Sequence, residues 1–496
     1  MTYDIAIVGG GINGAGIAAD AAGRGLTVLL AEKADLGSGT SSASSKLIHG
    51  GLRYLEHREL RLVREALAER EVLLAKAPHI VWPLRFLLPH VKGMRSRVLL
   101  RAGLLLYDHL ARRAVIPGSG AVDLRREPVG AALRPGIGAG FSYWDCWVDD
   151  ARLVVLNARA AAANGATILT RAEVVGVVAE DGVWRLEIET AAGRRVERAR
   201  ALVNAAGPWA GAFGQRIKGA PGMPVPRLRL VQGSHIVVAR AWPGEAALLL
   251  QSPDGRVVFA LPFEERFTLI GTTDTPFAGD ASQAAISAEE ERYLLAVVNG
   301  FLSRPLAPAD IVWRYAGVRP LYDDATGDPS KVTRDYRLEL SAAEGRPPLL
   351  TVLGGKITTY RKLAEAALER LAPHLGPHGP AWTRSAPLPG GELGPRGAAG
   401  LAADLARARP GLDRSYLARL VRRYGNLADA LLGDARSEAD LGEHFGGHLT
   451  AREVAYLASE EWALAPDDVL WRRTKAGLHL APNERARAAE AIERLL

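Results

Sequence analysis

A group of glycines and one acid near the N-terminus has the residue types and the spacing of a dinucleotide-binding turn. Gly9, Gly11 and Gly14 follow a short apolar run, and Glu32 closes the next apolar run along the chain. In such a turn the first glycine permits the tight bend, the second lets the backbone approach a pyrophosphate, and the third lets a helix pack against a strand. The start of that helix attracts phosphate charge. The acid accepts hydrogen bonds from ribose hydroxyls and disfavours a 2′-phosphate.

The neighbouring segments predict the elements that position this turn. Residues 5–8 predict a buried strand, residues 15–22 a helix and residues 26–31 a second strand, which together make one βαβ unit. No Lys-Ser or Lys-Thr pair follows the glycines, which excludes a Walker-type phosphate loop. The turn itself is compatible with NAD and with FAD.

Residues 37–54 come next and are dense in glycine and hydroxyl side chains. One interpretation is a flexible linker. The other is a loop whose backbone amides and hydroxyls wrap the phosphates and ring of a bound cofactor. The run His49-Gly50-Gly51, followed by Arg53, is an unusual composition for a solvated linker and favours the second interpretation.

The composition excludes several classes of protein. With 496 residues, 48% of them hydrophobic and 24% charged, the chain predicts a globular protein of about three domains. The single cysteine, Cys146, excludes an intrachain disulfide and a thiolate metal site, and it fits a reducing compartment. The net charge of +7 comes without a nucleic-acid-binding module, so no nucleic acid is expected as a partner. Neither a signal peptide nor an apolar run of about 18 residues is found, which predicts a cytoplasmic chain without a spanning helix.

The glycine turn, Glu32 and the segment 41–56 resemble the bacterial FAD-dependent, quinone-linked glycerol-3-phosphate dehydrogenases. The resemblance implies FAD bound noncovalently, oxidation of sn-glycerol 3-phosphate to dihydroxyacetone phosphate, and a membrane quinone as electron acceptor. It also implies the fold of the glycine and D-amino-acid oxidases. Further matching segments extend through nearly the whole chain, at residues 145–153, 203–209, 233–235, 271–274, 317–321, 333–336, 354–362 and 470–475.

The fold that the resemblance implies is α/β, or α+β when the whole chain is considered. A Rossmann-like FAD-binding domain is interleaved with an antiparallel-sheet substrate domain, and an all-helical domain follows at the C-terminus. The FAD-binding domain is expected at residues 1–80, 146–224 and 346–380. The substrate domain is expected at 225–345, with a cap or membrane-facing segment at 81–145, and a linker at 381–397 leads to the helical domain at 398–496.

The resemblance assigns the cofactor to residues in five parts of the chain. They are Gly9, Gly11, Gly14, Glu32, Thr40, Ser41, Ser42, Ser45, Lys46, Leu47, His49, Gly50, Gly51, Ala206, Gly207, Trp209, Gly355, Lys356, Thr358 and Thr359.

The substrate needs a phosphate clamp and a base. Planar guanidinium groups hold a dianionic phosphate well, and Arg53, Arg319 and Arg334 lie in segments that match the family. Histidine suits the base, and His235 lies in a strand-like segment. Lys356 or an Arg-polarised water is the alternative base, and the lysine can also steady a reduced flavin. The substrate site is therefore expected at Arg53, Tyr54, His235, Arg319, Arg334 and Lys356, of which His235, Arg319 and Lys356 are the expected catalytic residues.

Two alternative functions remain open at this point. One is a glycerol-3-phosphate oxidase that passes electrons to oxygen, and the other is a flavin-fold module that binds a nucleotide without turnover. An amino-acid oxidase is disfavoured because such a site clamps a carboxylate. No metal site is expected, since His444 and His448 are separated by the helix-breaking residues 445–447 and no HExxH glutamate is present.

Residues 85–115 are rich in arginine, and their second half is amphipathic. One interpretation is a surface that rests on anionic lipid, where a quinone can be reached. The other is a core helix with solvated arginines. The resemblance favours the membrane surface, which places the protein at the inner face of the cell membrane, and it is compatible with a homodimer.

Overall fold

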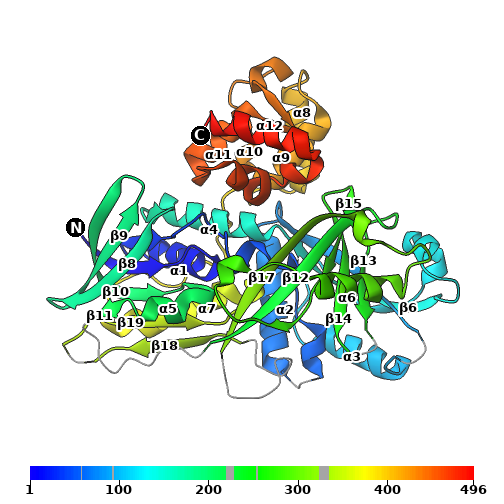
Figure 1. Ribbon diagram of the computed structural model, residues 1–496, viewed down its shortest axis with the longest axis horizontal. Coiled ribbons are helices and arrows are strands. Elements are labelled where there is room, and N and C mark those ends of the chain that lie inside the picture. The colour runs from blue at the N-terminus through cyan, green and yellow to red at the C-terminus, as the bar shows by residue number, and fades with distance from the viewer. Residues whose placement is uncertain (57–58, 92–93, 219–227, 253–254, 323–334, 344) are drawn as a thin grey trace.

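The computed structural model describes residues 1–56, 59–91, 94–218, 228–252, 255–322, 335–343 and 345–496. Two β-sheets lie next to each other, and a helical domain, drawn in orange and red, lies against them (Figure 1).

The first sheet has a parallel centre built on the predicted βαβ unit. β1 (Thr2–Val8) pairs in parallel with β2 (Val28–Ala31) on one side and with β10 (Gly193–Asn204) on the other. β2 is buried at every position, as is usual for parallel strands covered on both faces. The other strands of this sheet are β7 (Thr167–Leu169), β8 (Glu173–Glu180), β9 (Val183–Thr190), β11 (Ile217–Lys218), β18 (Arg337–Ser341) and β19 (Leu349–Leu353).

Three helices share a core with this sheet. α1 (Ile12–Gly23) packs against both α4 (Asp150–Ala163) and α7 (Tyr360–Leu371). α1 consists largely of alanine and glycine, and a Cβ on Gly16 would lie 2.6 Å from a ring carbon of Tyr360. The small residues that predicted a helix here are therefore also what allows α7 to approach it.

The second sheet is mostly antiparallel. β12 (Leu228–Ala239) pairs with β17 (Ile311–Tyr322) over nearly its whole length, which places His235 opposite Tyr315. Helices cover both faces: α2 (Leu60–Lys76) and α3 (Arg97–His109) pack on one, and α6 (Ala288–Asn299) packs on the other. The other strands are β3 (Leu47–Ile48), β4 (Val81–Pro89), β5 (Gly120–Asp123), β6 (Ala139–Val148), β13 (Ala247–Gln251), β14 (Val257–Phe263), β15 (Phe267–Gly271) and β16 (Thr275–Pro276).

The chain passes between the two sheets several times, as an interleaved fold requires. β3 pairs with β6 in the second sheet, and β7 then returns to the first sheet beside β2. β6 runs through residues 145 and 146, where the sequence analysis placed a boundary.

The C-terminal domain is helical, as predicted, with one exception. β20 (His444–Gly446) and β21 (Leu449–Thr450) form a small hairpin. Gly446 and Gly447 turn the chain there with φ of +82° and +56°, and strands this short carry no alternating pattern in the sequence. The helices of the domain are α8 (Gly397–Ala408), α9 (Arg414–Tyr424), α10 (Leu427–Leu432), α11 (Ala451–Glu461) and α12 (Pro482–Glu493). The predicted α/β fold with a helical C-terminal domain is confirmed.

Candidate functional site

A cavity of about 380 Å³ lies between the two sheets. Its walls come from the carboxyl ends of β1, β2, β10 and β19 in the first sheet and from β12 and β17 in the second. Open α/β sheets bind their ligands at this end of the strands. The predicted cofactor residues that line it are Gly9, Gly11, Glu32, Thr40, Ser41, Ser45, Leu47, His49, Ala206, Gly207, Trp209, Gly355, Lys356 and Thr358.

The glycine turn has the geometry that the spacing predicts. Gly9 has a φ of +111°, which glycine adopts without strain. A Cβ on Gly14 would lie 1.9 Å from the carbonyl oxygen of Gly9, so a larger residue does not fit. α1 begins at Ile12, which lines the cavity, and the backbone N–H of Ile12 donates to Ser41 Oγ at 3.0 Å. The start of α1 therefore borders the cavity, and the N-terminus of a helix attracts phosphate.

Glu32 ties the turn to the loop that follows β2. One carboxylate oxygen accepts from the backbone N–H of Gly10 at 2.6 Å, and the other accepts from that of Ala34 at 2.8 Å. Burial raises the pKa of Glu32, and these two hydrogen bonds oppose the rise. A carboxylate oxygen has more than one lone pair, so both oxygens can still accept from ribose hydroxyls.

Asn13 supplies an independent test of whether the cavity fits a dinucleotide. Its Nδ2 donates to the carbonyl oxygen of Gly354 at 3.1 Å, while its buried Oδ1 accepts no hydrogen bond from the described residues. A buried acceptor is costly unless a group donates to it. Because Asn13 lines the cavity, this oxygen fits a hydroxyl-bearing ligand such as FAD.

Two guanidinium groups lie near one carboxylate, and one of them, that of Arg319, lines the cavity. Arg319 donates to Asp274 Oδ1 at 2.5 Å and to Thr272 Oγ1 at 2.9 Å, and Arg53 lies 3.8 Å from the other oxygen of Asp274. Gly233 makes the room, since a Cβ there would lie 2.3 Å from a guanidinium nitrogen of Arg319. These contacts fix the orientation of the Arg319 guanidinium.

Lys356 adds a third positive charge. It follows the carboxyl end of β19, and its Nζ lies 3.8 Å from the centre of the Tyr54 ring. Both side chains line the cavity together with Arg319. Three expected substrate residues therefore meet in the same cavity as the dinucleotide turn.

His235 does not line the cavity itself but contacts a residue that does. It is 1% exposed, and its Nε2 lies 2.9 Å from Ser45 Oγ, while Ser45 lines the cavity. The ring stacks on Tyr315 at 4.7 Å. Gly271 leaves space for it, because a Cβ there would lie 2.1 Å from the imidazole. Burial first, and then the charges of Arg319 and Lys46, hold the pKa of His235 well below 6.5.

Lys46 does not line the cavity, although it was expected to bind the cofactor. It is buried, and its Nζ donates to Asp150 Oδ1 at 2.7 Å and to the carbonyl oxygen of Ser42 at 3.1 Å. Asp150 also accepts from the hydroxyl of Ser44 at 2.7 Å. Lys46 has a φ of +57°, so this ion pair holds the bend that presents Ser45 to His235.

Arg53 and Gly50 are not among the residues that line the cavity. Gly50 donates its backbone N–H to the hydroxyl of Tyr107 on α3 at 2.8 Å. Arg334 lies outside the described residues. Four further predicted cofactor residues are not among those that line the cavity: Gly14, Ser42, Gly51 and Thr359.

Three residues of the site were not predicted from the sequence. Asn13 lies inside the glycine turn, and Thr272 and Asp274 lie in the segment 271–274 that matches the family. Their position in these segments was the available signal. Within the described part of the chain, no cluster of three or more His, Cys, Asp or Glu side chains can hold a metal ion.

A glycine turn and a buried acid at the carboxyl end of a parallel sheet, opposite a cluster of cations, are typical of a dinucleotide-binding enzyme. The family model described as FAD dependent oxidoreductase matches residues 4–361. The model described as C-terminal domain of alpha-glycerophosphate oxidase matches residues 381–496. The chain therefore belongs to the FAD-dependent oxidoreductase family, and the predicted cofactor FAD is confirmed.

The curated relatives agree with the resemblance found in the sequence. The chain is 54% identical to a glycerol-3-phosphate dehydrogenase of Pseudomonas aeruginosa, over 99% of this chain and 95% of the relative. It is 48% identical to the aerobic glycerol-3-phosphate dehydrogenase of Escherichia coli, over 99% and 97% of the two chains. A D-erythritol 1-phosphate dehydrogenase of Brucella abortus is 49% identical, also over 99% and 97%.

A solved structure shares the fold. The glycerol-3-phosphate dehydrogenase of Bacillus halodurans, complexed with FAD, matches with a TM-score of 0.77 and 26% identity, over 100% of this chain and 94% of the other.

Proposed function

We propose that the chain oxidises sn-glycerol 3-phosphate to dihydroxyacetone phosphate. The carbon that bears the secondary hydroxyl loses a hydride, and the hydroxyl loses a proton. FAD, when bound, supplies the hydride acceptor. The observation that carries the proposal is that Arg319, which is ion-paired with Asp274 next to Arg53, lines the same cavity as Lys356 and the dinucleotide turn.

The phosphate is the part of the substrate that these cations recognise. Arg319 is oriented by Thr272 and Asp274, and a planar guanidinium binds phosphate oxygens through parallel hydrogen bonds. Lys356, which follows β19 of the first sheet, adds a positive point charge across the cavity from Arg319 on β17 of the second sheet. A substrate without phosphate loses these contacts but keeps the same reacting alcohol.

The proton has a path to His235. The imidazole is neutral because of its lowered pKa, and its Nε2 lies 2.9 Å from Ser45 Oγ at the cavity wall. We assign Ser45 Oγ as the relay that takes the proton of the substrate hydroxyl while it passes its own proton to Nε2. Tyr315 stacks on the His235 ring, and its hydroxyl donates to the carbonyl oxygen of Ser44 at 2.8 Å. It thereby fixes the position of the imidazole relative to the loop that carries Ser45.

A four-carbon phosphorylated alcohol is the second candidate substrate. The relative from Brucella abortus is named for D-erythritol 1-phosphate and is about as similar to this chain as the Escherichia coli relative. The test is the initial rate of oxidation of both phosphates and of glycerol with a soluble dye as acceptor, with dihydroxyacetone phosphate measured as product. A higher kcat/KM for erythritol 1-phosphate would reassign the substrate.

We also propose that electrons leave to a membrane quinone and that α3 lies on the lipid surface. One face of α3 carries exposed apolar side chains, with Val98 81%, Leu99 60% and Leu106 43% exposed. Only Leu104 and Tyr107 of this helix are buried. Unpartnered apolar faces of this kind mark interaction sites.

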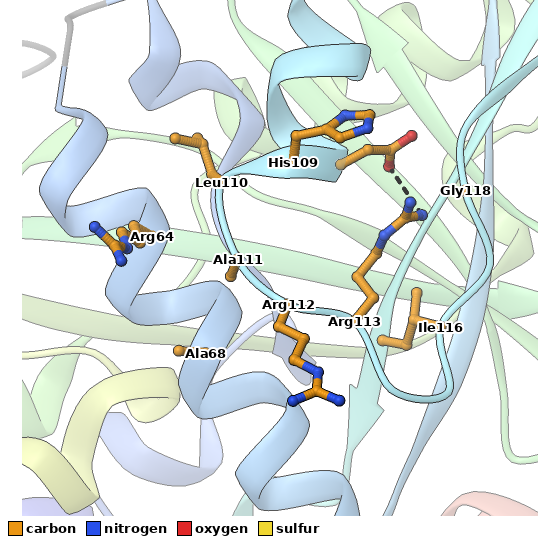
Figure 2. Close-up of a pocket in the computed structure, with 10 residues that line it drawn as sticks. Arg64, Ala68, His109, Leu110, Ala111, Arg112, Arg113, Ile116 and Gly118 are labelled. Carbon is orange, nitrogen blue, oxygen red and sulfur yellow. Dashed lines mark ion pairs between the residues drawn. The ribbon is translucent and has the colours of Figure 1, made fainter.

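Positive charge gathers at the C-terminal end of α3. A pocket of about 670 Å³ lies there, and Figure 2 shows Arg64 on α2 and Arg112 and Arg113 on the loop that follows α3. Arg113 is paired with Asp108 at 3.5 Å, and no ion pair within the described residues engages Arg64 or Arg112. Among those residues no helix is both long and apolar enough to span a bilayer.

Vesicle sedimentation tests the docking surface. Wild type should sediment with anionic vesicles at low salt, and the double variant Leu99→Ser, Leu106→Ser should stay in the supernatant with unchanged dye-linked turnover. Val312→Ser, at an exposed apolar residue of β17, is the matched control and should sediment like wild type. Equal sedimentation of all three would refute α3 as the docking face.

A further inference from the structure

The segment Asp468–Arg473 of the C-terminal domain reaches the FAD-binding domain. It forms a turn of π-helix, a rare conformation that is frequent at functional sites. It belongs to the segment 470–475 that matches the family, and nothing in the reaction described above uses it. Its side chains contact the loop that follows β2 and Glu32.

Asp35 of that loop is the centre of the contact. It is 2% exposed, and Arg473, which is fully buried, donates to its two carboxylate oxygens at 2.6 Å and 2.8 Å. Arg472 also donates to Asp35. Burial would raise the pKa of Asp35, but the two guanidinium groups outweigh burial and lower it. The carboxylate is therefore charged and held in a bidentate geometry.

The same loop borders the cofactor cavity. Ser38 donates its backbone N–H to the carbonyl oxygen of Asp35 at 3.1 Å, and Gly37 donates to that of Gly10 at 2.9 Å. Gly37 and Ser38 line the cavity together with Lys33. Fixing Asp35 therefore fixes the wall on the side of Glu32, where the adenosine of FAD is expected.

Asp468 extends the contact to a second point on the FAD-binding domain. It accepts from Arg171 at 2.6 Å and also from Arg472. The backbone N–H of Arg171 in turn donates to the carbonyl oxygen of Ala34 at 2.8 Å. The loop is thus held on both sides by groups that the C-terminal domain orients.

We propose that Arg472 and Arg473 of the C-terminal domain are positioning residues for FAD, which retain the cofactor by clamping Asp35 and with it the cavity wall at residues 33–39. The C-terminal domain is then a part of the cofactor site although none of its residues lines the cavity. The proposal concerns retention of FAD and does not depend on the identity of the substrate.

The test compares two buried arginines that both join the domains. Arg473→Lys keeps the charge but loses the bidentate contact with Asp35. Arg152→Lys, on α4, disrupts the buried pair with the Glu461 carboxylate of the C-terminal domain. Arg473 also donates to Glu461, but to its backbone carbonyl oxygen, which the substitution leaves in place. The FAD dissociation constant is measured on purified, full-length holoenzyme by diluting it and quantifying free FAD after ultrafiltration, and melting temperatures report the loss of stability separately.

Arg473→Lys should raise the FAD dissociation constant about tenfold, within the usual range of coupling between two sites, whereas Arg152→Lys should leave it unchanged while lowering the melting temperature. Asp35→Asn should reproduce the weaker binding and decides the matter if Arg473→Lys does not fold. An unchanged dissociation constant in the clamp variants, or an equal rise in Arg152→Lys, would overturn the proposal.

Discussion

Replacing Arg319 by glutamine should remove most of the preference for a phosphorylated substrate. The Arg319 side chain is 23% exposed and is oriented by Asp274 and Thr272, so a contact with phosphate would be partly shielded from water. A hydrogen bond to a charged group contributes about 1.5–3 kcal/mol. Taking the lower value for each of two bonds gives about 3 kcal/mol, which corresponds to a roughly 100-fold loss in kcat/KM.

The assay is the rate of anaerobic flavin reduction at increasing concentrations of glycerol 3-phosphate and of glycerol. The loss should appear with glycerol 3-phosphate and be small with glycerol, because only the first substrate carries the phosphate. Arg314→Gln is the matched control, since Arg314 lies on the same strand, pairs with Glu291 and does not line the cavity. An equal loss with both substrates would refute the phosphate clamp.

Three further predictions concern the base, the glycine turn and a buried histidine. Because burial and the charges of Arg319 and Lys46 keep the pKa of His235 well below 6.5, kcat should stay constant as the pH falls through 6.5, and a loss of half the activity near pH 6.5 would count against His235 as the base. Gly14→Ala should yield protein without flavin absorbance, because the new Cβ would lie 1.9 Å from the carbonyl oxygen of Gly9; a normally yellow variant would contradict this packing argument. Burial, followed by the charges of Arg152 and Arg422, lowers the pKa of His79 to about 3, so the unfolded chain binds a proton below pH 6.5 that the folded chain does not. This contribution to stability is present above pH 6.5 and is lost as the pH falls toward about 3. The denaturant midpoint of His79→Phe should therefore depend less on pH between 6.5 and 4 than that of wild type, and an equal pH dependence would contradict this reasoning.

Local chemistry explains which parts of the site could be predicted from the sequence. Gly9, Gly14 and Glu32 act within one βαβ unit, where spacing along the chain determines the geometry. Lys46 shows the limit of this reasoning, because its partner Asp150 lies 104 positions further along the chain. A motif marks the lysine, but only the packing of α4 against the loop shows that its charge is already used.

The contacts that His235 makes across the second sheet could not be predicted from the sequence either. The pairing of β12 with β17 brings His235 next to Tyr315, and the end of β15 leaves the space that the imidazole fills at Gly271. The stacking and the Ser45 contact depend on this register, which the apolar pattern of either strand does not specify. The clamp on Asp35 likewise joins residues 438 positions apart.

The most direct test of the account is the response of the purified flavoprotein to substrate in the absence of oxygen. If the cations around Asp274 hold a phosphate beside the flavin, glycerol 3-phosphate should bleach the flavin absorbance and glycerol at the same concentration should leave it unchanged. Bleaching by both alcohols at equal rates, or by neither, would contradict the central claim.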